Sequence, residues 1–401
     1  MNERVVVENT KVVADERAPR ASLLWLVAPF VVLAAALWWL VAADPLAGFN
    51  NGAPPVENLT VERTILDQDG LRLLVRGGGS EAMHIAQVQV DAAYWQFEQT
   101  PPGPIERAGT AWISVPFPWV LGEAHNVTLV TNTGATFEHE IPVAIATPVA
   151  TSGALASQAL LGAFVGILPV AIGLMFYPAL RGAGPWMMSF LLAMTIGLLG
   201  FLLIDTIEEA LEFAAASAPL FQGSAMVILA AAAAFLILMA ISRRERRPSG
   251  LALATYIALG IGLHNLGEGL AIGAAFAAGA AGLGTFLVMG FTLHNITEGI
   301  AIAAPILKTR PPLSRFAALA LLAGGPAVLG IWLGSLAYAP HWSALALAIG
   351  AGAILQVIVE VSAALTRANE ERLAGLLTTP VLAGAGSGVA FMYLTAMLVK
   401  I

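Results

Sequence analysis

The sequence predicts an all-α polytopic membrane protein, preceded by one anchor helix and a small exported β-rich domain. Three observations predict this class. Of the 401 residues, 58% are hydrophobic and only 11% are charged, less than half of the roughly 25% typical of soluble domains. Uncharged apolar runs long enough to span a bilayer recur along the chain. Strand-like polar sequence is confined to one stretch, residues 46–150.

The same composition excludes several classes of protein. A soluble enzyme and a disordered chain both need more charge. Lys and Arg total 19 and form no patch outside short loops, so nucleic acid is not an expected partner, whereas the lipid bilayer is. The chain contains no cysteine, which excludes disulfides, Cys-ligated zinc, iron–sulfur clusters and Cys nucleophiles.

The N-terminal region predicts a tail and an anchor. Residues 1–20 are polar and mixed in charge, whereas residues 21–43 contain no charged side chain over the length of a membrane span. A cleaved signal peptide is the alternative, but this apolar run exceeds the usual ~7–15 residues of a signal peptide. We therefore expect an uncleaved anchor, and in either case the following segment is exported.

Residues 46–150 are expected to form the exported domain. Turn signals such as Asp69-Gly70 and Pro101-Pro102-Gly103 separate short strand-like runs. These runs are 71–76, 84–97, 111–115, 127–131 and 136–145. Five or six short strands of this kind predict a small β-sandwich. The sequence does not identify a ligand or partner for it.

Residues 154–401 predict eight membrane-spanning helices. The expected spans are 154–180, 186–212, 221–241, 251–276, 283–307, 314–338, 342–366 and 378–400. Breaks that contain Lys or Arg alternate with breaks that contain neither. The positive-inside rule then assigns the N-terminus to the cytoplasm and places residues 46–150 and the C-terminus outside. The expected location is the plasma membrane, as a multi-pass protein.

Two glutamates within expected membrane spans are the main indication of function. Glu268 is the only charged residue of span 251–276, and Glu298 is the only one of span 283–307. A charge at mid-membrane costs at least ~2.5–3.5 kcal/mol on insertion scales, so such a residue marks a functional site by default. Both lie in one pattern, His-Asn-x-x-Glu-Gly, at 264–269 and 294–299. Its spacings of three and four residues place the three side chains on one helix face.

The two motifs predict a metal site. The spans are antiparallel neighbours, so both motifs fall near one membrane depth. The candidate ligands are His264, Asn265, Glu268, His294, Asn295 and Glu298. Imidazole, carboxylate and amide groups suit Zn²⁺, Fe²⁺ or Mn²⁺. A lone His or Glu that caps a neighbouring helix is the structural alternative, but the duplication at matched depth favours a site. Asn follows each His, so the His-Glu-x-x-His pattern of zinc proteases is absent.

Further polar residues are candidates for an ion pathway. Asp205, Glu208, Glu209 and Glu212 end span 186–212. They form either a cation-attracting vestibule or a solvated helix end, and the sequence does not decide between the two. Gln356 and Glu360 lie toward the cytoplasmic end of span 342–366. Glu360 could line an exit path or extend to the interface, and we expect the pathway role.

At these residues the chain resembles the ZIP family of divalent-metal transporters. The motifs HNLGEG at 264–269 and HNITEG at 294–299 are similar to those of the family's fourth and fifth membrane helices. The stretches LLIDTIEEALE at 202–212 and LAIGAGAILQVIVE at 347–360 look like its second and seventh helices. The resemblance covers residues 154–401.

The resemblance implies an eight-helix transporter bundle, a metal site between its fourth and fifth helices, and often a homodimer. It also implies inward movement of the metal ion by alternating access. Two positions depart from the family pattern. Thr297 stands where Pro is common, and Gly325-Pro326 stands where a Glu-Pro pair often helps form a second metal position. Whether this chain holds one metal ion or two therefore stays open.

The leading hypothesis is a divalent-metal importer and not an enzyme. Its substrate would be Zn²⁺ first, with Fe²⁺ or Mn²⁺ as alternatives. An intramembrane metal-dependent enzyme is a second hypothesis, which a product formed from a membrane substrate would distinguish. A third is a metal-sensing or assembly protein that binds metal without moving it and recruits a partner through the exported domain.

Overall fold

A computed structural model describes residues 23–43, 55–147, 149, 151–182, 184–243, 248–277, 281–336, 339–368 and 377–399. The chain divides into two compact units, Met1–Pro54 and Pro55–Ile401. The predicted tail, residues 1–20, lies outside the described residues, as do Arg244, Arg246, Arg247 and Arg372 of the predicted basic breaks. The first unit contains helix α1 (Leu23–Ala43) at the position of the predicted anchor.

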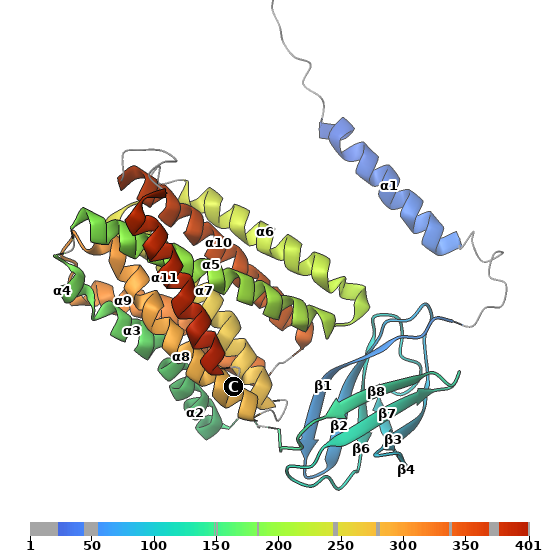
Figure 1. Cartoon of the computed structure of the whole chain (residues 1–401). Helices are drawn as coiled ribbons and strands as arrows, with labels where there is room; N and C mark the ends of the chain where they lie inside the picture. Colours follow the sequence, from blue (N-terminus) through green and yellow to red (C-terminus); the bar gives the residue numbers. More distant parts are fainter. Residues whose placement is uncertain are drawn as a thin grey trace, which may run out of the picture. The chain divides into compact units, whose positions relative to one another are not determined.

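Residues 59–141 form a β-sandwich of two antiparallel four-stranded sheets (Figure 1). The strands are β1 (Leu59–Asp67), β2 (Gly70–Gly77), β3 (Ile85–Val90), β4 (Ala93–Trp95), β5 (Glu98–Thr100), β6 (Thr110–Val115), β7 (His125–Thr131) and β8 (Thr136–Ile141). Their order is β1-β2-β6-β5 in one sheet and β4-β3-β7-β8 in the other. Leu73, Ile113 and Leu129 from the two sheets are fully buried in one shared apolar core. Alternating inward apolar residues therefore hold the sheets together, as in other sandwiches.

The sandwich differs from the strand pattern expected from sequence at β1, in the run 84–97, and at β5, which lies outside every expected run. Strand β1 was not expected, because its pairing with β2 shifts between Val61 and Arg63 and such a bulge breaks the two-residue alternation. The run 84–97 is a hairpin and not one strand. Asp91 and Ala92 turn the chain there with positive φ angles of 52° and 63°, as a two-residue hairpin turn requires, without the Gly or Asn that usually signals it.

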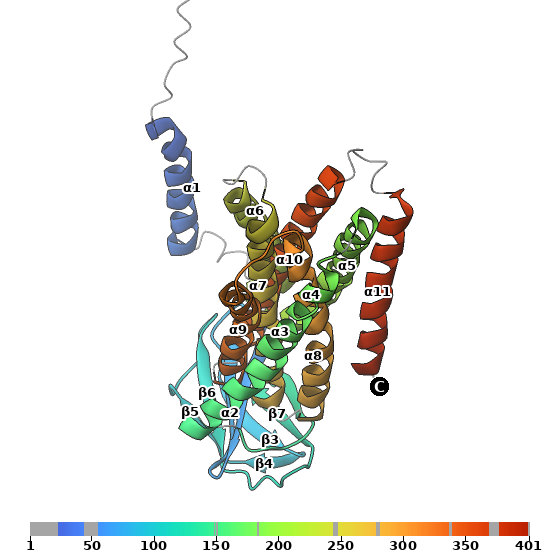
Figure 2. The ribbon, with the colours of Figure 1, turned by 90° about the vertical axis from the view of Figure 1, so that its left-hand side faces the viewer.

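The rest of the described chain is helical (Figures 1 and 2). The helices are α2 (Ser152–Gly162), η2 (Ala163–Ile167), α3 (Leu168–Leu174), α4 (Tyr177–Leu180), α5 (Pro185–Ala215), η3 (Pro219–Phe221), α6 (Gly223–Ser242), α7 (Gly250–Ala277), α8 (Ala281–Ala303), η4 (Ala304–Ile306), α9 (Leu313–Leu336), α10 (Pro340–Ala368) and α11 (Thr379–Val399). Within the described residues, eight segments are long and apolar enough to cross a membrane. The predicted class is confirmed at this level: the chain is a multi-pass membrane protein with a small β domain.

The first span contains a local irregularity. Between α2 and α3, residues 163–167 form a π-helical turn, a rare feature that is frequent at functional sites. Gly166 lies in this turn, and a Cβ atom added to it would come 2.3 Å from the carbonyl oxygen of Gly324 in α9. The absence of a side chain at Gly166 therefore lets the turn and α9 touch through their backbones.

Glycine contacts join helices α2, η2, α3, α7, α8 and α9 into one tightly packed set, here called group A. A Cβ atom on Gly269 of α7 would lie 2.2 Å from the carbonyl oxygen of Ala327 in α9. A Cβ atom on Gly299 of α8 would lie 2.2 Å from the carbonyl oxygen of Val170 in α3. Small residues permit this backbone approach, which drives helix association in lipid, where apolar burial does not.

Helices α5, α6, α10 and α11 form a second set, here called group B. A Cβ atom on Gly197 of α5 would lie 2.1 Å from the carbonyl oxygen of Ala385 in α11. A Cβ atom on Gly352 of α10 would lie 2.2 Å from the carbonyl oxygen of Ala231 in α6, and α10 also packs along α5.

The boundary between α7 of group A and α10 of group B differs in the atoms that meet there. A Cβ atom on Gly260 would meet the side chain of Val357 at 2.5 Å, and one on Gly267 would meet the side chain of Leu347 at 2.7 Å. A Cβ atom on Gly350 would lie 3.1 Å from the Cα atom of His264. At Gly260 and Gly267 the nearest atoms of α10 therefore belong to side chains, which can change rotamer where backbone carbonyls cannot.

Candidate metal centre

Helices α7 and α8 bring the two His-Asn-x-x-Glu motifs together in the interior of the bundle. His264, Asn265 and Glu268 lie on α7, and His294, Asn295 and Glu298 lie on α8. All six side chains are buried, with 0–7% of the residue surface exposed. A spacing of three or four residues keeps each set on one face of its helix. The six candidate ligands therefore all lie at the interior of the helical bundle.

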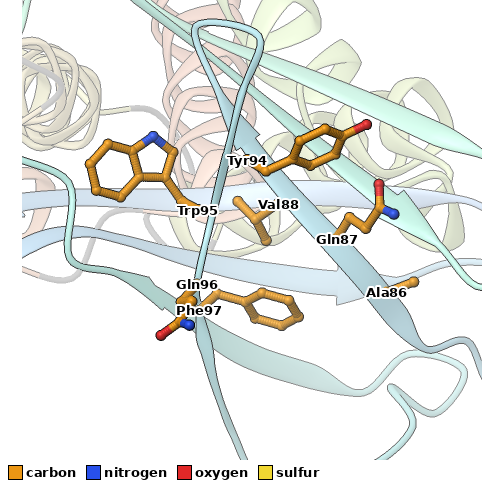
Figure 3. Close-up of a pocket in the computed structure, with 7 residues that line it drawn as sticks. All are labelled: Ala86, Gln87, Val88, Tyr94, Trp95, Gln96 and Phe97. Atoms are coloured by element: carbon orange, nitrogen blue, oxygen red, sulfur yellow. The ribbon is translucent and has the colours of Figure 1, made fainter.

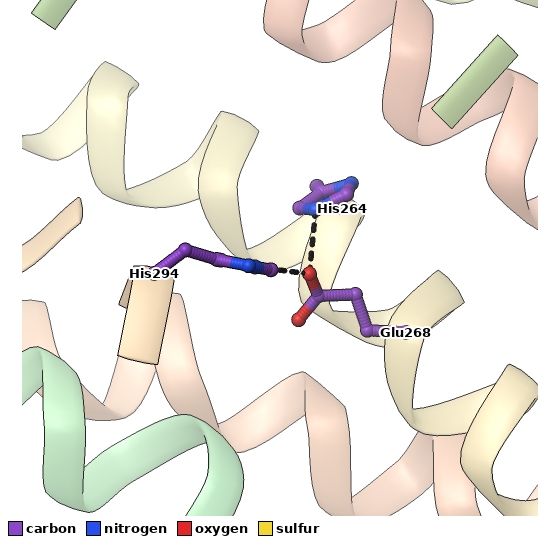
Figure 4. Close-up of side chains that lie close together, drawn as sticks. All are labelled: His264, Glu268 and His294. Atoms are coloured by element: carbon purple, nitrogen blue, oxygen red, sulfur yellow. Dashed lines mark hydrogen bonds and ion pairs between the residues drawn. The ribbon is translucent and has the colours of Figure 1, made fainter. Parts of the chain in front are cut away.

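Three of the six converge on one point (Figure 4). The Nε2 atom of His264 lies 2.9 Å from Oε1 of Glu268, and the Nε2 atom of His294 lies 2.6 Å from the same oxygen. One potential ligand atom from each residue lies within 4.8 Å of the others. Glu268 is thus shared between an imidazole of its own helix and an imidazole of the neighbouring helix.

The spacing of these three atoms suits a small divalent cation. Bonds from zinc to His nitrogen or carboxylate oxygen are about 2.0–2.2 Å, which places tetrahedral ligand atoms about 3.3 Å apart. The two observed N–O distances are 2.9 and 2.6 Å. A cation could therefore enter after a small outward movement of the side chains and loss of the protons shared between nitrogen and oxygen.

The two asparagines connect the carboxylates to the backbone of neighbouring helices. The Asn265 amide nitrogen donates to the carbonyl oxygen of Ala323 at 3.1 Å and to Oε2 of Glu298 at 3.3 Å. The Asn295 amide nitrogen donates to the carbonyl oxygen of Val165 at 3.0 Å and to Oε2 of Glu268 at 3.4 Å. Each Asn therefore holds the carboxylate that belongs to the other motif.

Three buried oxygens at this site lack a donor within the part of the chain that the structure describes. They are Oδ1 of Asn265, Oδ1 of Asn295 and Oε1 of Glu298. A buried acceptor without a partner carries a cost of about 1–3 kcal/mol. A metal ion or its bound water would satisfy such oxygens. Asn265, Asn295 and Glu298 are thus able to serve a cation, although they lie outside the cluster of three ligand atoms.

Thr206 of α5 is a site residue that the sequence patterns did not reveal. Its Oγ1 atom donates to the carbonyl oxygen of Leu202 at 2.7 Å and lies 3.2 Å from Nδ1 of His264. With its own proton occupied, the hydroxyl can accept Nδ1–H, which leaves Nε2 free for a metal. Such a second contact commonly fixes the tautomer of a metal-binding histidine. The nearest signal in the sequence was the adjacent Asp205.

The acids of α5 divide into two sets. Asp205 and Glu209 are half-buried, and they interact electrostatically with the cluster, Asp205 with His294 and Glu209 with His264 and Glu268. Glu208 and Glu212 are exposed. Asp205 and Glu209 are therefore placed to attract a cation that approaches the cluster. Glu208 and Glu212 lie on the outer surface of α5.

Gln356 and Glu360 lie away from the three converging side chains. Gly350 is the residue of α10 that lies beside His264. Glu360 is ten residues further along α10, which at 1.5 Å per residue is about 15 Å away. Glu360 is buried, and its Oε1 accepts a hydrogen bond of 2.8 Å from Ser242 of α6. The Nε2 atom of Gln356 is buried without a partner among the described residues.

The β-sandwich carries a separate open groove of about 520 Å³ beside strands β3 and β4 (Figure 3). Tyr94 and Trp95 line it together with Gln87, Gln96 and Phe97. The Tyr94 side chain is exposed, whereas Trp95 packs edge-on against Phe117 at a ring distance of 5.2 Å. Trp95, Phe97 and Phe117 thus pack against the core of the sandwich, whereas Tyr94 does not.

No protein-family model matches the chain, and no curated protein matches it. The ZIP resemblance therefore rests on the two hexapeptide motifs and on the stretches 202–212 and 347–360. The geometry of the site is independent of that resemblance.

Proposed function

We propose that this protein is a transporter of divalent metal cations with Zn²⁺ as the leading substrate, and that it belongs with the ZIP transporters that its motifs resemble. The observation that carries the proposal is the meeting of His264, Glu268 and His294 inside membrane-spanning helices. Ionisable groups at such positions typically mark ion pathways. Zn²⁺, and Fe²⁺ or Mn²⁺ as alternatives, accept this mixture of nitrogen and oxygen ligands.

Charge balance supports a divalent substrate. Glu268 and Glu298 together would supply two negative charges, which match one divalent cation in a region where unpaired charge is costly. The ion would displace protons from the imidazole nitrogens as it binds. Proton return to Glu268, Glu298 or the imidazoles would then assist release.

The packing of the helices supports alternating access. All six candidate ligands belong to group A, whose helices touch through their backbones at glycines such as Gly269 and Gly299. Contact with α10 of group B runs through side chains such as Val357 and Leu347. Group A would move as one body with its ion, while the α7–α10 boundary rearranges.

The direction of transport follows from the proposed orientation in the plasma membrane. With basic breaks in the cytoplasm, the acids of α5 lie toward the outside and Glu360 lies toward the cytoplasm. Asp205 and Glu209 would attract the hydrated ion to the cluster. Gln356 and Glu360 would receive it on the way inward.

Metal flux into vesicles tests the proposal. The purified full chain is reconstituted, and uptake of Zn²⁺, Fe²⁺ and Mn²⁺ is followed beside Glu268→Gln and a matched control, Glu212→Gln, whose side chain is exposed. We expect uptake by the wild type and the control and at least ~10-fold less by Glu268→Gln. Absence of uptake for every metal, or equal uptake by both variants, would contradict transport through this site.

A second candidate function is metal sensing coupled to a partner. The groove of about 520 Å³ beside Tyr94 favours it, because an exposed aromatic beside amide side chains is typical of binding surfaces. This function requires tight metal binding without flux. Equilibrium binding measured beside the vesicle assay separates the two, because a transporter must release its ion on the far side.

A further inference from the structure

A second groove lies in the helical bundle, at the boundary between groups A and B. Leu263, Leu266 and Leu270 of α7 line one wall, and Leu345, Ala346 and Ile349 of α10 line the other. Its volume is about 420 Å³, within the range of about 300–1,000 Å³ that is typical of ligand pockets. None of the residues that line it is charged. Its occupant must therefore be largely apolar.

The groove lies within the membrane-spanning segments. Its walls belong to the spans Gly250–Ala277, Leu313–Leu336 and Pro340–Thr366. From Trp342 to Ile349 it extends about 10 Å along α10, at 1.5 Å per residue. Trp342 and Leu333 at its rim are 58% and 52% exposed, so the groove is reached from the surface that the bilayer surrounds.

One polar atom distinguishes this groove from a plain apolar crevice. Ser343 lines it and is 0% exposed, and its hydroxyl has no hydrogen-bond partner among the described residues. It lies in the first turn of α10, beside Trp342. Tryptophan is enriched at the membrane interface, the level at which the ester groups of phospholipids lie. A buried hydroxyl at that level calls for an acceptor.

We propose that this groove binds one acyl chain of a glycerophospholipid, taken from the leaflet on the side where α9 ends and α10 begins. The chain lies between the leucines of α7 and Ala346 and Ile349 of α10. The Ser343 hydroxyl donates to the ester carbonyl oxygen of that chain. A transmembrane helix of a second copy does not fit, because a 10 Å length of a helix about 10–12 Å across occupies about 800–1,100 Å³, whereas the groove holds about 420 Å³.

The position of the groove gives the lipid a consequence for the bundle. Leu263 at its inner end is adjacent to His264, and Gly350, next to Ile349, approaches the Cα atom of His264. A bound chain therefore fills the boundary at which the two groups meet beside the metal centre. By packing between α7 and α10, the bound acyl chain stabilises the arrangement of groups A and B in which the groove is open.

Lipid binding to the full chain tests the proposal in the absence of metal, so its outcome does not depend on transport. Protein stripped of lipid in detergent is titrated with palmitoyl-oleoyl phosphatidylglycerol, and bound lipids are counted by native mass spectrometry. The variant Ala346→Trp fills the groove, and Ala233→Trp places the same ring on an exposed position of α6. We expect the tightest lipid to bind at least ~10-fold more weakly to Ala346→Trp than to the wild type, and normally to Ala233→Trp.

A smaller change tests the role of Ser343 without risk to folding. An ether-linked phospholipid with the same chains lacks the ester carbonyl, and we expect the wild type to prefer the ester lipid by about 3–10-fold, the value of one buried hydrogen bond. Ser343→Ala should lose this preference. Unchanged lipid binding by Ala346→Trp would overturn the groove as a lipid site. The same conclusion would follow if Ala346→Trp changed the oligomeric state and left lipid binding unchanged. An ester preference that survives Ser343→Ala would overturn the proposed hydrogen bond.

Discussion

Glu268 and Glu298 occupy the same place in two nearly matching hexapeptides, yet their carboxylates have different partners. Glu268 receives both imidazoles at 2.9 and 2.6 Å and the Asn295 amide at 3.4 Å. Glu298 receives the Asn265 amide at 3.3 Å, and its other oxygen has no partner among the described residues. The duplicated motif therefore supplies each type of ligand twice, but the two glutamates have unequal sets of hydrogen-bond partners.

The environment of each helix explains the inequality. Helix α7 lies between α9 and α10, and its glutamate lies beside the histidines of both motifs. Helix α8 packs against α3 on its other side. We infer that Glu268 is the principal carboxylate ligand, whereas Glu298 balances charge and completes the coordination of the bound ion.

Neutralising each carboxylate in turn is the sharpest way to test this inequality. Glu268→Gln should weaken Zn²⁺ affinity by at least ~100-fold, which corresponds to about 3 kcal/mol, because it removes the charge shared by two imidazoles. Glu298→Gln should weaken it by about 10-fold, as is typical of groups that support a site from outside the first ligands. Competition with a chelating dye in detergent measures both. Equal losses would mean that the two motifs contribute alike.

The glycines that end the two motifs, Gly269 and Gly299, should differ from the glutamates, because substitution of either should lower stability by the same amount. A Cβ atom on Gly269 or on Gly299 would come 2.2 Å from a backbone oxygen of the neighbouring helix. Replacement of either by Ala should therefore cost about 1–3 kcal/mol of stability, seen as a lower thermal midpoint in detergent. Gly325→Ala is the matched control, since nothing lies within 4 Å of its added Cβ. A midpoint that is unchanged in Gly269→Ala and Gly299→Ala would show that the helices separate without cost.

Much of the fold could be predicted from the sequence because the bilayer demands long apolar runs. The predicted span 251–276 and helix α7 (Gly250–Ala277) differ by one residue at each end. Strand β1 escaped prediction, since its bulge near Glu62 breaks the alternation on which strands are recognised. The turn at Asp91 and Ala92 escaped it too, because Ala92 stands where the usual Asp-Gly turn has its glycine.

The same limit applies to the site. The spacing of His264 and Glu268 is local and follows from the helical repeat. The common depth of the two motifs follows from the antiparallel order of two consecutive spans. Their unequal partners depend on how α8 packs against α3 and α7, which no local pattern encodes. Thr206 is 58 residues from His264 in sequence and belongs to no motif, so only the packing of α5 brings it to the site.

The two imidazoles offer the last and smallest test of the inequality between the motifs. His264 has the Thr206 hydroxyl at its Nδ1 atom, 3.2 Å away, whereas the His294 ring packs edge-on against Phe291 at 5.5 Å. Thr206→Val keeps the shape and removes the acceptor, so the His264 ring loses the contact that keeps Nε2 free for the ion. We expect Zn²⁺ affinity to fall by about 2–10-fold, the value of one hydrogen bond, in the same dye competition. Phe291→Leu removes no hydrogen bond and should leave the affinity within about 2-fold. A loss in Phe291→Leu as large as that in Thr206→Val would place the orienting role on packing around His294 and not on the hydroxyl beside His264.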